Sequence, residues 1–481
     1  MRLVRARIFA PENRKWWTLG AVSFALFMIM LDNTVVNVAL PSIQRDLGVG
    51  LSELEWTVNA YALTFAVLML TGGKLADFLG RRRIFVIGLA IFTLSSLFCG
   101  LATSGEWLIS ARTVQGIGAA LMLPATLSII SATFPVRERG MAIGIWAGVS
   151  AMALAIGPLV GGLLTEHINW SWIFFINVPI GVLGFVTARL VIRESRDTSA
   201  EQRLDVPGLL VSGVAMFALV FALIEANGYG WTSGIILGLF ATAGIGLVAF
   251  VLLERHQRAP MLDLSLFRSG TFAGANVVAL LVFLAMFGVF FFVSIYMQNV
   301  LGYSPVKTGA VFLPMTVLIM FVAPAAGKAS DRIGSRWLVT GGMTLVGLAL
   351  LIYSRLDVDS GFWDLFPGLL VGGLGMATVM TPVTAAAIGS VPVAKAGVGS
   401  GVLNTFRQVG GALGIAVMGA IVASQIDVSP RDPAFEGEFM DGFSIALRVA
   451  AVIAFAGAVL AAAMIRRYRH MEVAEMAEAA A

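Results

Sequence analysis

Charged side chains are scarce in this sequence: Asp, Glu, Lys and Arg make up 12% of its 481 residues, whereas 58% are hydrophobic. Soluble domains carry about 25% charged residues. Because so few charges cannot cover a water-exposed surface of this size, most of the folded surface is expected to face lipid. The net charge of +4 does not indicate a nucleic-acid partner, since the basic residues lie in short clusters between apolar runs.

Cysteine and histidine are nearly absent as well. The one cysteine, Cys99, lies in an apolar run, and the three histidines (His167, His256 and His470) are far apart. These residues allow no internal disulfide framework and suggest no His/Cys metal site. The sequence also has no recognisable nucleophile–base set and no phosphate-binding loop. We therefore predict neither an enzyme nor an ATP-driven pump, with no catalytic residues, no metal and no cofactor.

Long apolar runs are what the sequence has in abundance. A membrane-spanning helix needs about 20 mostly apolar residues, and Gly and Pro are tolerated inside it. We predict an all-α membrane protein with 14 transmembrane helices. The predicted spans are 17–40, 54–75, 84–103, 107–131, 141–164, 172–192, 206–226, 232–253, 271–297, 305–326, 337–355, 365–388, 397–424 and 443–465.

The basic residues alternate between the links that join these spans. If the N-terminus lies in the cytoplasm, the inner segments hold 25 of the 32 Lys and Arg residues and the outer segments hold four. The other three, Arg112, Arg407 and Arg448, lie inside predicted spans. The excess of positive charge on the inner links predicts that both termini are cytoplasmic.

A charged motif occurs twice, 254 residues apart. "GKLADFLGRR" (73–82) and "GKASDRIGSR" (327–336) agree at five of ten positions. A second half that repeats the first is typical of secondary transporters, and two further spans lie between the halves. We expect a six-helix bundle at 1–195, two inserted helices with flanking loops at 196–259, and a second six-helix bundle with a short cytoplasmic tail at 260–481.

The repeated motif has two interpretations. Asp77 can face the positive end of a helix that starts on the same side, and the neighbouring arginines can pair with acids across the halves. Such a cluster could close an inner gate in one state and release it in another. The alternative is a topology anchor that only holds the loop inside. The candidate gate residues are Gly73, Asp77, Gly80, Arg81, Asp331 and Gly334.

Asp32 lies inside the first predicted span, where a carboxylate is expensive and indicates function. At about 1.5 Å per residue it is roughly 22 Å past Trp17, and Arg112 is about 8 Å from the opposite face. In a hydrocarbon core roughly 30 Å thick these depths agree, so the two can form an ion pair. Burial disfavours the charged carboxylate and a nearby arginine favours it, so the site can exchange a proton. The alternative is a fixed pair that only ties two spans together.

Arg407 falls near the middle of the thirteenth predicted span, between Asn404 and Gln408 on one helix face. One interpretation is a polar patch that lines the substrate cavity. The other is a strut to backbone carbonyls or to an acid of the second half. The candidates for the substrate cavity are Asn33, Asn37, Gln115, Asn404, Arg407 and Gln408.

Taken together, the motifs resemble the major facilitator superfamily, and within it the 14-span drug:proton antiporters. The fifth span carries an antiporter-like motif in which Gly148, Gly157 and Gly161 give small faces and Pro158 kinks the helix. Ser171 departs from the group's pattern, which has arginine between two tryptophans. The stretches that carry the resemblance are "LDNTVVNVALP" (31–41), "GGKLADFLGRRR" (72–83), "LISARTVQGIGAA" (108–120), "GVSAMALAIGPLVGG" (148–162), "WSWIFFINVPIG" (170–181) and "NTFRQVGGALG" (404–414).

The resemblance implies a proton-coupled antiporter that exports lipophilic drugs across a bacterial inner membrane by alternating access, with the proton gradient as its energy source. The tenth predicted span has no acid, so monocationic rather than dicationic substrates are implied. The implied roles are proton coupling for Asp32 and Arg112, the inner gate for Asp77 and Arg81, and a seal of the central interface for Gly157 and Pro158.

The predicted partners are a small lipophilic substrate, protons and the lipid bilayer, and not nucleic acid. The oligomeric state is left open, and a monomer is compatible with the sequence. The alternative function is narrow export of one endogenous metabolite, such as an antibiotic, a siderophore or a lipid.

Overall fold

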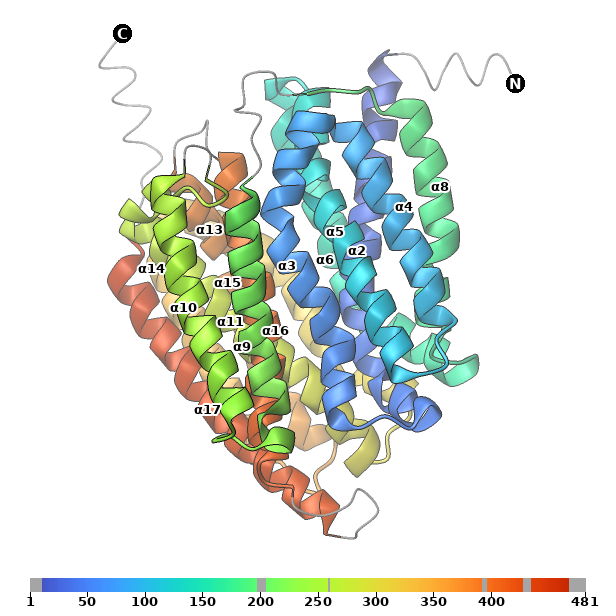
Figure 1. Cartoon of the computed structure of the whole chain (residues 1–481), viewed down its shortest axis with the longest axis vertical. Coiled ribbons are helices and arrows are strands. Elements are labelled where there is room, and N and C mark those ends of the chain that lie inside the picture. The colour runs from blue at the N-terminus through green and yellow to red at the C-terminus, as the bar shows by residue number, and fades with distance from the viewer. Residues whose placement is uncertain (1–10, 197–204, 258–259, 392–395, 427–433, 467–481) are drawn as a thin grey trace. The chain divides into compact units, whose positions relative to one another are not determined.

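The computed structural model describes residues 11–196, 205–257, 260–391, 396–426 and 434–466 (Figure 1). These residues form helices joined by turns and contain no strand. Within them, 14 helices are long and apolar enough to cross a membrane, which confirms the predicted number. The fold class is therefore all-α, as the apolar runs predicted.

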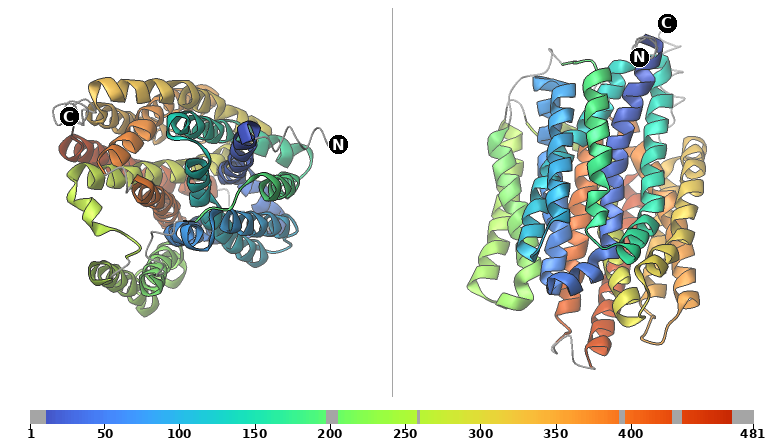
Figure 2. Two further views of the ribbon diagram at one scale, coloured as in Figure 1. Left: turned by 90° about the horizontal axis from the view of Figure 1, so that it is seen from above. Right: turned by 90° about the vertical axis from the view of Figure 1, so that its right-hand side faces the viewer.

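The first of two compact units, unit 1, comprises Met1–Leu262 and Val293–Leu313. In this unit α5 packs along both α3 and α4, and α2 packs on α6 and α8 (Figure 2). The helices of unit 1 are α2 (Pro11–Leu47), α3 (Leu51–Leu79), α4 (Arg81–Gly100), α5 (Gly105–Thr133), α6 (Val136–His167), α7 (Trp172–Phe175), α8 (Asn177–Val191), α9 (Val206–Tyr229), α10 (Gly234–His256), the π-helical turn η2 (Tyr296–Val300) and α12 (Pro305–Val311).

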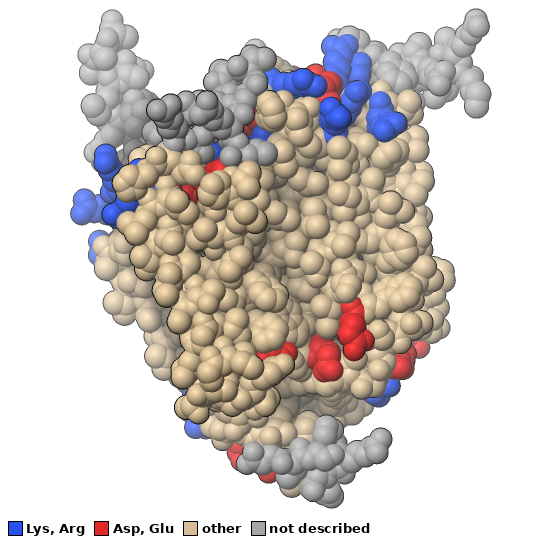
Figure 3. Space-filling view, in the orientation of Figure 1, with Lys and Arg blue, Asp and Glu red and all other residues tan. Residues whose placement is uncertain are grey.

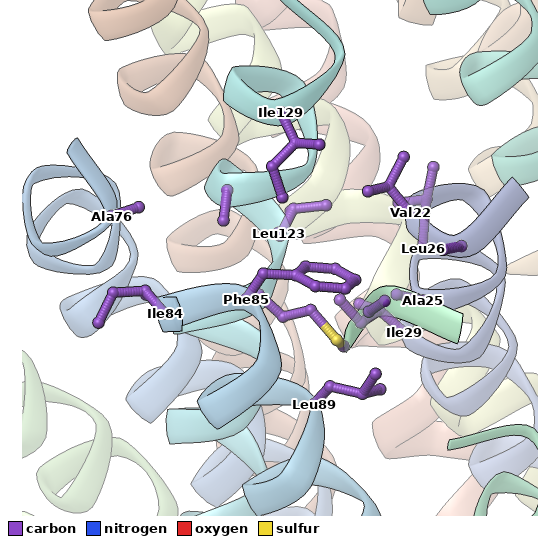
Figure 4. Close-up of a cluster of buried hydrophobic side chains, with 14 of the residues drawn as sticks. Val22, Ala25, Leu26, Ile29, Ala76, Ile84, Phe85, Leu89, Leu123 and Ile129 are labelled. Atoms are coloured by element: carbon purple, nitrogen blue, oxygen red, sulfur yellow. The ribbon is translucent and has the colours of Figure 1, made fainter. Parts of the chain in front are cut away.

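An apolar cluster in unit 1 is contributed mainly by α2, α3, α4 and α5, with smaller contributions from α6 and α8 (Figure 4). Val22, Phe85 and Leu123 meet there, each at most 6% exposed. Lipid tails are as apolar as these side chains, so close packing holds the helices together rather than exclusion of water. A Cβ on Gly88 of α4 would lie 2.8 Å from the carbonyl oxygen of Gly118 in α5, so only glycine allows this approach. The tight packing of α4 on α5 positions the polar site described below.

The two inserted helices, α9 and α10, pair with each other, and α9 packs on α3. The ring of Trp56 in α3 lies 5.9 Å from that of Phe217 and 5.8 Å from that of Phe221. Aromatic pairs at such distances contribute about 0.5–1.5 kcal/mol each beyond their buried area. An aromatic cluster thus forms the middle of the α3–α9 contact.

Polar contacts fasten the inserted pair to α3 at two places. Near the start of α3, Glu225 of α9 accepts hydrogen bonds from Ser52 Oγ at 2.7 Å and Trp56 Nε1 at 2.9 Å. Near the end of α3, Lys74 Nζ donates to the carbonyl oxygen of Pro260 at 2.5 Å, just after α10. The attachment is therefore not limited to apolar packing.

The second compact unit, unit 2, comprises Asp263–Phe292 and Pro314–Ala481. In it α14 packs along α15 and α17. The predicted division into 1–195, 196–259 and 260–481 follows the sequence repeat, whereas the compact units follow contacts, so that division stays a prediction. The helices of unit 2 are η1 (Leu264–Arg268), α11 (Gly270–Ile295, whose last residues belong to unit 1), α13 (Leu313–Ile333), α14 (Ser335–Tyr353), α15 (Phe362–Gly389), α16 (Ala396–Ala423) and α17 (Phe435–Met464).

Candidate functional site

The centre of the site is an ion pair buried in unit 1. Asp32 of α2 and Arg112 of α5 are 0% and 1% exposed, and Arg112 Nη1 lies 2.5 Å from Asp32 Oδ2. The agreement in depth that the sequence suggested is therefore realised as a direct contact. Removing one partner of a buried pair leaves an uncompensated charge, which typically destabilises a protein by about 3–5 kcal/mol.

A set of neutral polar groups surrounds the pair. Gln115 lies one turn beyond Arg112; its Nε2 donates to Asp32 Oδ1 at 3.0 Å, and its Oε1 accepts from Arg112 Nη1 at 2.7 Å. Arg112 Nε donates to the backbone carbonyl of Thr57 in α3 at 3.1 Å. Arg112 thus has other acceptors besides the carboxylate, namely the Gln115 side chain and the Thr57 carbonyl.

Asn177, the first residue of α8, was not among the predicted site residues. Its Nδ2 donates to Asp32 Oδ1 at 3.3 Å and to Ser96 Oγ of α4 at 3.0 Å. It lies in the stretch 170–181 that resembles the 14-span group, and that polar position inside an apolar run was the one available signal. Four helices, α2, α4, α5 and α8, therefore contribute side chains to one network.

Aromatic rings enclose the guanidinium of Arg112. Its Cζ lies 4.2 Å from the ring centroid of Tyr61 and 5.7 Å from that of Phe174. A cation held over an aromatic face gains about 0.5–2 kcal/mol, most where water is excluded. The rings therefore stabilise the arginine charge without competing for Asp32, and nothing in the sequence alone singles out either residue.

The other predicted cavity residues of α2 are not joined to this network by any hydrogen bond of the described residues. Asn37 is buried, and its Nδ2 donates to the backbone carbonyl of Asn33 at 3.2 Å. Asn33 itself is half-buried. A role of either residue in binding a substrate stays a prediction.

The first copy of the repeated motif forms a tight corner between α3 and α4. Asp77 Oδ1 accepts hydrogen bonds from Arg81, with Nη2 at 2.8 Å and Nε at 2.9 Å. Gly80 joins the two helices with φ of 117° and ψ of 128°, a conformation that L side chains rarely adopt. Gly73 makes only an ordinary contact, since a Cβ there would lie 3.5 Å from Pro124.

An unpredicted acid completes this corner. Glu194 accepts hydrogen bonds from the backbone nitrogens of Arg82 at 3.0 Å and Arg83 at 3.1 Å, the first residues of α4. A carboxylate at the N-terminus of a helix satisfies free amides and complements the helix dipole. The side chain of Arg82 also faces Glu194, with Nε 3.9 Å from Oε2, so this arginine has an acid partner in its own unit.

The second copy of the motif repeats the glycine corner. Gly334 joins α13 to α14 with φ of 87°, and its nitrogen donates to Ser330 O at 2.9 Å. Asp331 belongs to α13, but its side chain lies outside the described residues. The gate function of both copies stays a prediction.

The glycines of the antiporter-like motif differ from one another. A Cβ on Gly157 would overlap the side chain of Thr34 in α2, and one on Gly161 would lie 2.8 Å from Val35 O. The carbonyl of Pro158 faces Gly309 of α12. Gly148 has nothing within 4 Å of such a Cβ, so the close packing of α6 involves Gly157 and Gly161 but not Gly148.

Arg407 in α16 makes polar contacts inside unit 2. Its Nη2 donates to Thr384 Oγ1 at 2.5 Å and lies 3.4 Å from Met380 O, while Nη1 lies 3.3 Å from Asn404 Oδ1. Its Cζ is 5.6 Å from the ring centroid of Phe283. These contacts match the strut to a backbone carbonyl, and no acid pairs with Arg407 among the described residues. Gln408 is half-buried beside it.

In the part of the chain that the structure describes, no group of three or more His, Cys, Asp or Glu side chains could hold a metal ion. The 14 apolar helices and the buried charged network are those of a multi-pass membrane protein. A profile of the Major Facilitator Superfamily matches residues 22–415, and the chain belongs to this superfamily. It is therefore a transporter and not an enzyme, as the sequence predicted.

Curated relatives cover most of the chain. It is 38% identical over 420 residues to the tetracenomycin C resistance and export protein of Streptomyces glaucescens, with 87% of this chain and 78% of that protein covered. It is 39% identical over 415 residues to the multidrug resistance protein Stp of Mycobacterium tuberculosis, with 86% and 76% covered. It is 36% identical over 461 residues to the puromycin resistance protein pur8 of Streptomyces alboniger, with 94% and 91% covered.

Solved structures show the same fold at low sequence identity. A bacterial homologue of the human lysosomal transporter Spinster, crystallised inward-facing and unoccupied, matches with a TM-score of 0.67 and 19% identity, covering 94% of this chain and 98% of that one. A POT family transporter in complex with 5-aminolevulinic acid matches with a TM-score of 0.68 and 15% identity, covering 93% and 96%.

Proposed function

We propose that this protein is a proton-coupled antiporter that exports lipophilic, monocationic drugs across the inner membrane of a bacterium by alternating access. The observation that carries the proposal is the buried Asp32–Arg112 pair with its neutral polar surround. The relatives named for tetracenomycin C export, multidrug resistance and puromycin resistance support drug export. The proton gradient is the proposed energy source.

The network supplies what a proton-exchange site needs. When Asp32 takes up a proton, its ion pair with Arg112 is lost, and the guanidinium keeps Gln115 Oε1, the Thr57 carbonyl and the ring of Tyr61. When Asp32 loses the proton, the amides of Gln115 and Asn177 and the arginine stabilise the carboxylate. Both states thus have partners within hydrogen-bond reach, and exchange with alternating sides of the membrane couples the proton to transport.

The proposed orientation places both termini in the cytoplasm. Over unit 1, Lys and Arg gather at one end of the face shown in Figure 3. Contacts tie that end together: Arg14 Nε donates to Val191 O at 2.6 Å, and Lys15 Nζ lies 2.5 Å from Glu138 Oε2. The Arg81–Arg83 corner is joined to the same end through Glu194. This gathering supports the positive-inside orientation.

The alternative is export of one endogenous metabolite, and the relative named for tetracenomycin C resistance and export favours it. A panel of lipophilic cations and neutral antibiotics separates the two. Resistance to several unrelated compounds supports the multidrug exporter, whereas resistance to one compound class supports the narrow one.

The experiment that tests the proposal is ethidium efflux from energised cells, with and without a protonophore, for wild type and Asp32→Asn. Asp46→Asn is the matched control, because Asp46 is an exposed carboxylate of the same helix. We expect the protonophore and Asp32→Asn each to abolish efflux and the control to retain it. Efflux that survives Asp32→Asn would contradict proton coupling at this site. No efflux in wild type, with expression confirmed, would favour the narrow exporter.

A further inference from the structure

The contact between α3 and the inserted helix α9 contains two acids, Glu55 and Glu225. They lie at the opposite end of α3 from the repeated motif. Glu55 of α3 is only 2% exposed, and Glu225 of α9 is half-buried. Glu55 lies three residues after Ser52 and directly before Trp56 in α3, and both of those residues hold Glu225, so the two carboxyls are neighbours at this contact. Glu225 Oε1 is held by Ser52 and Trp56 of α3, which fixes its position at the contact.

This pair has no counter-charge among the described residues. Neither acid takes part in an ion pair there. Two carboxylates in a buried, largely apolar contact repel each other strongly, because the low local dielectric screens them little. The two carboxylates are therefore expected to bind a positive charge that relieves this repulsion.

The charged groups on the helices that pack against α3 do not supply this charge. Arg112 of α5 is bound to Asp32, and Arg81 of α4 is bound to Asp77 near the other end of α3. The remaining charged side chains toward the Glu55 end are the exposed residues Arg45, Asp46, Glu53 and Glu106. Of these only Arg45 is basic, and it donates to Ser42 on its own helix.

Polar atoms without a hydrogen-bond partner lie beside the pair. Glu55 Oε2 is buried with no hydrogen-bond partner, and so are both Oδ1 and Nδ2 of Asn59, which is 0% exposed. Asn59 follows Glu55 by four residues and so lies on the same face of α3. Buried polar groups are normally hydrogen-bonded, and a proton on Glu55 would supply a donor for Asn59 Oδ1.

We propose that Glu55 and Glu225 form a second proton-binding site, in which Glu55 takes up the proton beside the Glu225 carboxylate. Aqueous hydronium is the source of the proton: one of its O–H bonds breaks, an O–H bond forms on the carboxyl, a water molecule is released, and the charge of the pair changes from −2 to −1. A proton is small enough to enter a packed helix contact. The protonated carboxyl has an O–H group, and Asn59 Oδ1 can accept a hydrogen bond from it directly or through water. This inference rests on the proposed function, because it adds a second exchangeable proton to the proposed antiporter.

The position of this site relates it to the Asp32 network. Thr57, whose carbonyl accepts from Arg112, lies about 3 Å from Glu55 along the axis of α3. The two sites are thus at similar depth on different faces of one helix. The inserted helix α9 contributes Glu225 together with the aromatic wall of Phe217 and Phe221, which gives the inserted pair a part in proton binding.

The test is infrared difference spectroscopy of the purified full-length protein in lipid during a pH titration, which reads the carbonyl band of protonated carboxyls without any transport. We expect Glu55→Gln to remove one protonated carboxyl that wild type holds at neutral pH. Glu225→Gln should shift the pH at which the band titrates. Glu53→Gln, an exposed acid of the same helix, is the matched control and should leave the band unchanged.

A band identical in wild type and Glu55→Gln overturns the proposal, provided that both elute as monodisperse protein. Repeating the comparison on an Asp32→Asn background assigns the band, since Asp32 then contributes nothing. Loss of the band with Glu55→Gln on both backgrounds supports the second site. Failure of the proposed function appears elsewhere, as efflux that a protonophore does not affect, so the two failures are distinguishable.

Discussion

Asn177 donates from a single amide nitrogen to Asp32 Oδ1 at 3.3 Å and to Ser96 Oγ at 3.0 Å, and thereby links α8 and α4 to the charged pair of α2 and α5. Two short helices, α7 and α8, meet just before this residue. The start of α8 is therefore placed so that its first side chain reaches the carboxylate.

Replacing Asn177 by Ala is expected to weaken proton coupling without breaking the ion pair. Asp32 would keep Arg112 and Gln115 but lose one donor to its charged form, and a lost buried hydrogen bond costs about 1–3 kcal/mol. The measurement is the pH profile of ethidium efflux, which should shift relative to wild type. Asn169→Ala, an exposed amide near the start of α7, is the control. An unchanged profile for Asn177→Ala would show that this amide does not act on Asp32.

Arg112→Lys is expected to be far from conservative. The guanidinium donates to Asp32, Gln115 and the Thr57 carbonyl at once and lies over Tyr61, and an ammonium cannot reproduce this planar set. We expect efflux to fall at least tenfold while the protein still reaches the membrane. Arg112→Ala should also unfold more readily, by about 3–5 kcal/mol, because Asp32 is left buried and unpaired.

Thermal unfolding of the detergent-purified variants checks the second half of this prediction. The double variant Asp32→Asn, Arg112→Gln removes both charges and should recover most of the lost stability without recovering proton-dependent efflux. A double variant as unstable as Arg112→Ala would mean that the aromatic and backbone contacts, rather than the unpaired carboxylate, determine the loss.

Gly80→Ala is expected to destabilise the corner between α3 and α4. At φ of 117° and ψ of 128° a side chain is strained, and a Cβ would lie 2.7 Å from the Glu194 carboxylate. A residue forced into such a conformation costs on the order of 1–3 kcal/mol. Unfolding temperature and efflux should both fall. Gly144→Ala, at a helical glycine with free space around it, should leave both unchanged.

Gly157→Ala and Gly148→Ala separate the two ends of the antiporter-like motif. A methyl group at Gly157 would overlap Thr34 and push α6 from α2, a type of overpacking that costs about 1–3 kcal/mol. At Gly148 the space is open, so alanine should be tolerated. Drug resistance of cells that express each variant at equal levels is the measurement. Equal loss for both would point to a role of Gly148 other than packing.

The number of helices and the central ion pair could be predicted from sequence for simple physical reasons. A span is defined by the length of its apolar run, and the fixed rise of a helix gives each residue a depth, which was enough to match Asp32 with Arg112. Gln115 followed from helical spacing. Span length, depth and helical spacing are properties of each helix by itself, so predicting them requires no knowledge of how the helices pack.

The contacts that could not be predicted depend on how helices rotate about their axes and pack. Asn177, Tyr61 and Glu194 each reach a partner on another helix or at a corner, and spacing along the chain does not reveal this. Gly148 and Gly157 look alike in the sequence, yet only one of them meets a neighbouring helix. Glu55 lies close to the end of a predicted span, where a carboxylate is ordinarily exposed, so its burial depends on packing that the sequence does not show.

The attachment of the inserted pair has a mechanical consequence. Glu225 is bonded to Ser52 and Trp56 near one end of α3, and the segment after α10 is bonded to Lys74 near the other. A helix held at two distant points cannot tilt or slide independently of its support. The inserted pair and α3 are thus expected to move as one rigid unit, so a tilt of α3 would also have to displace the lipid around α9 and α10.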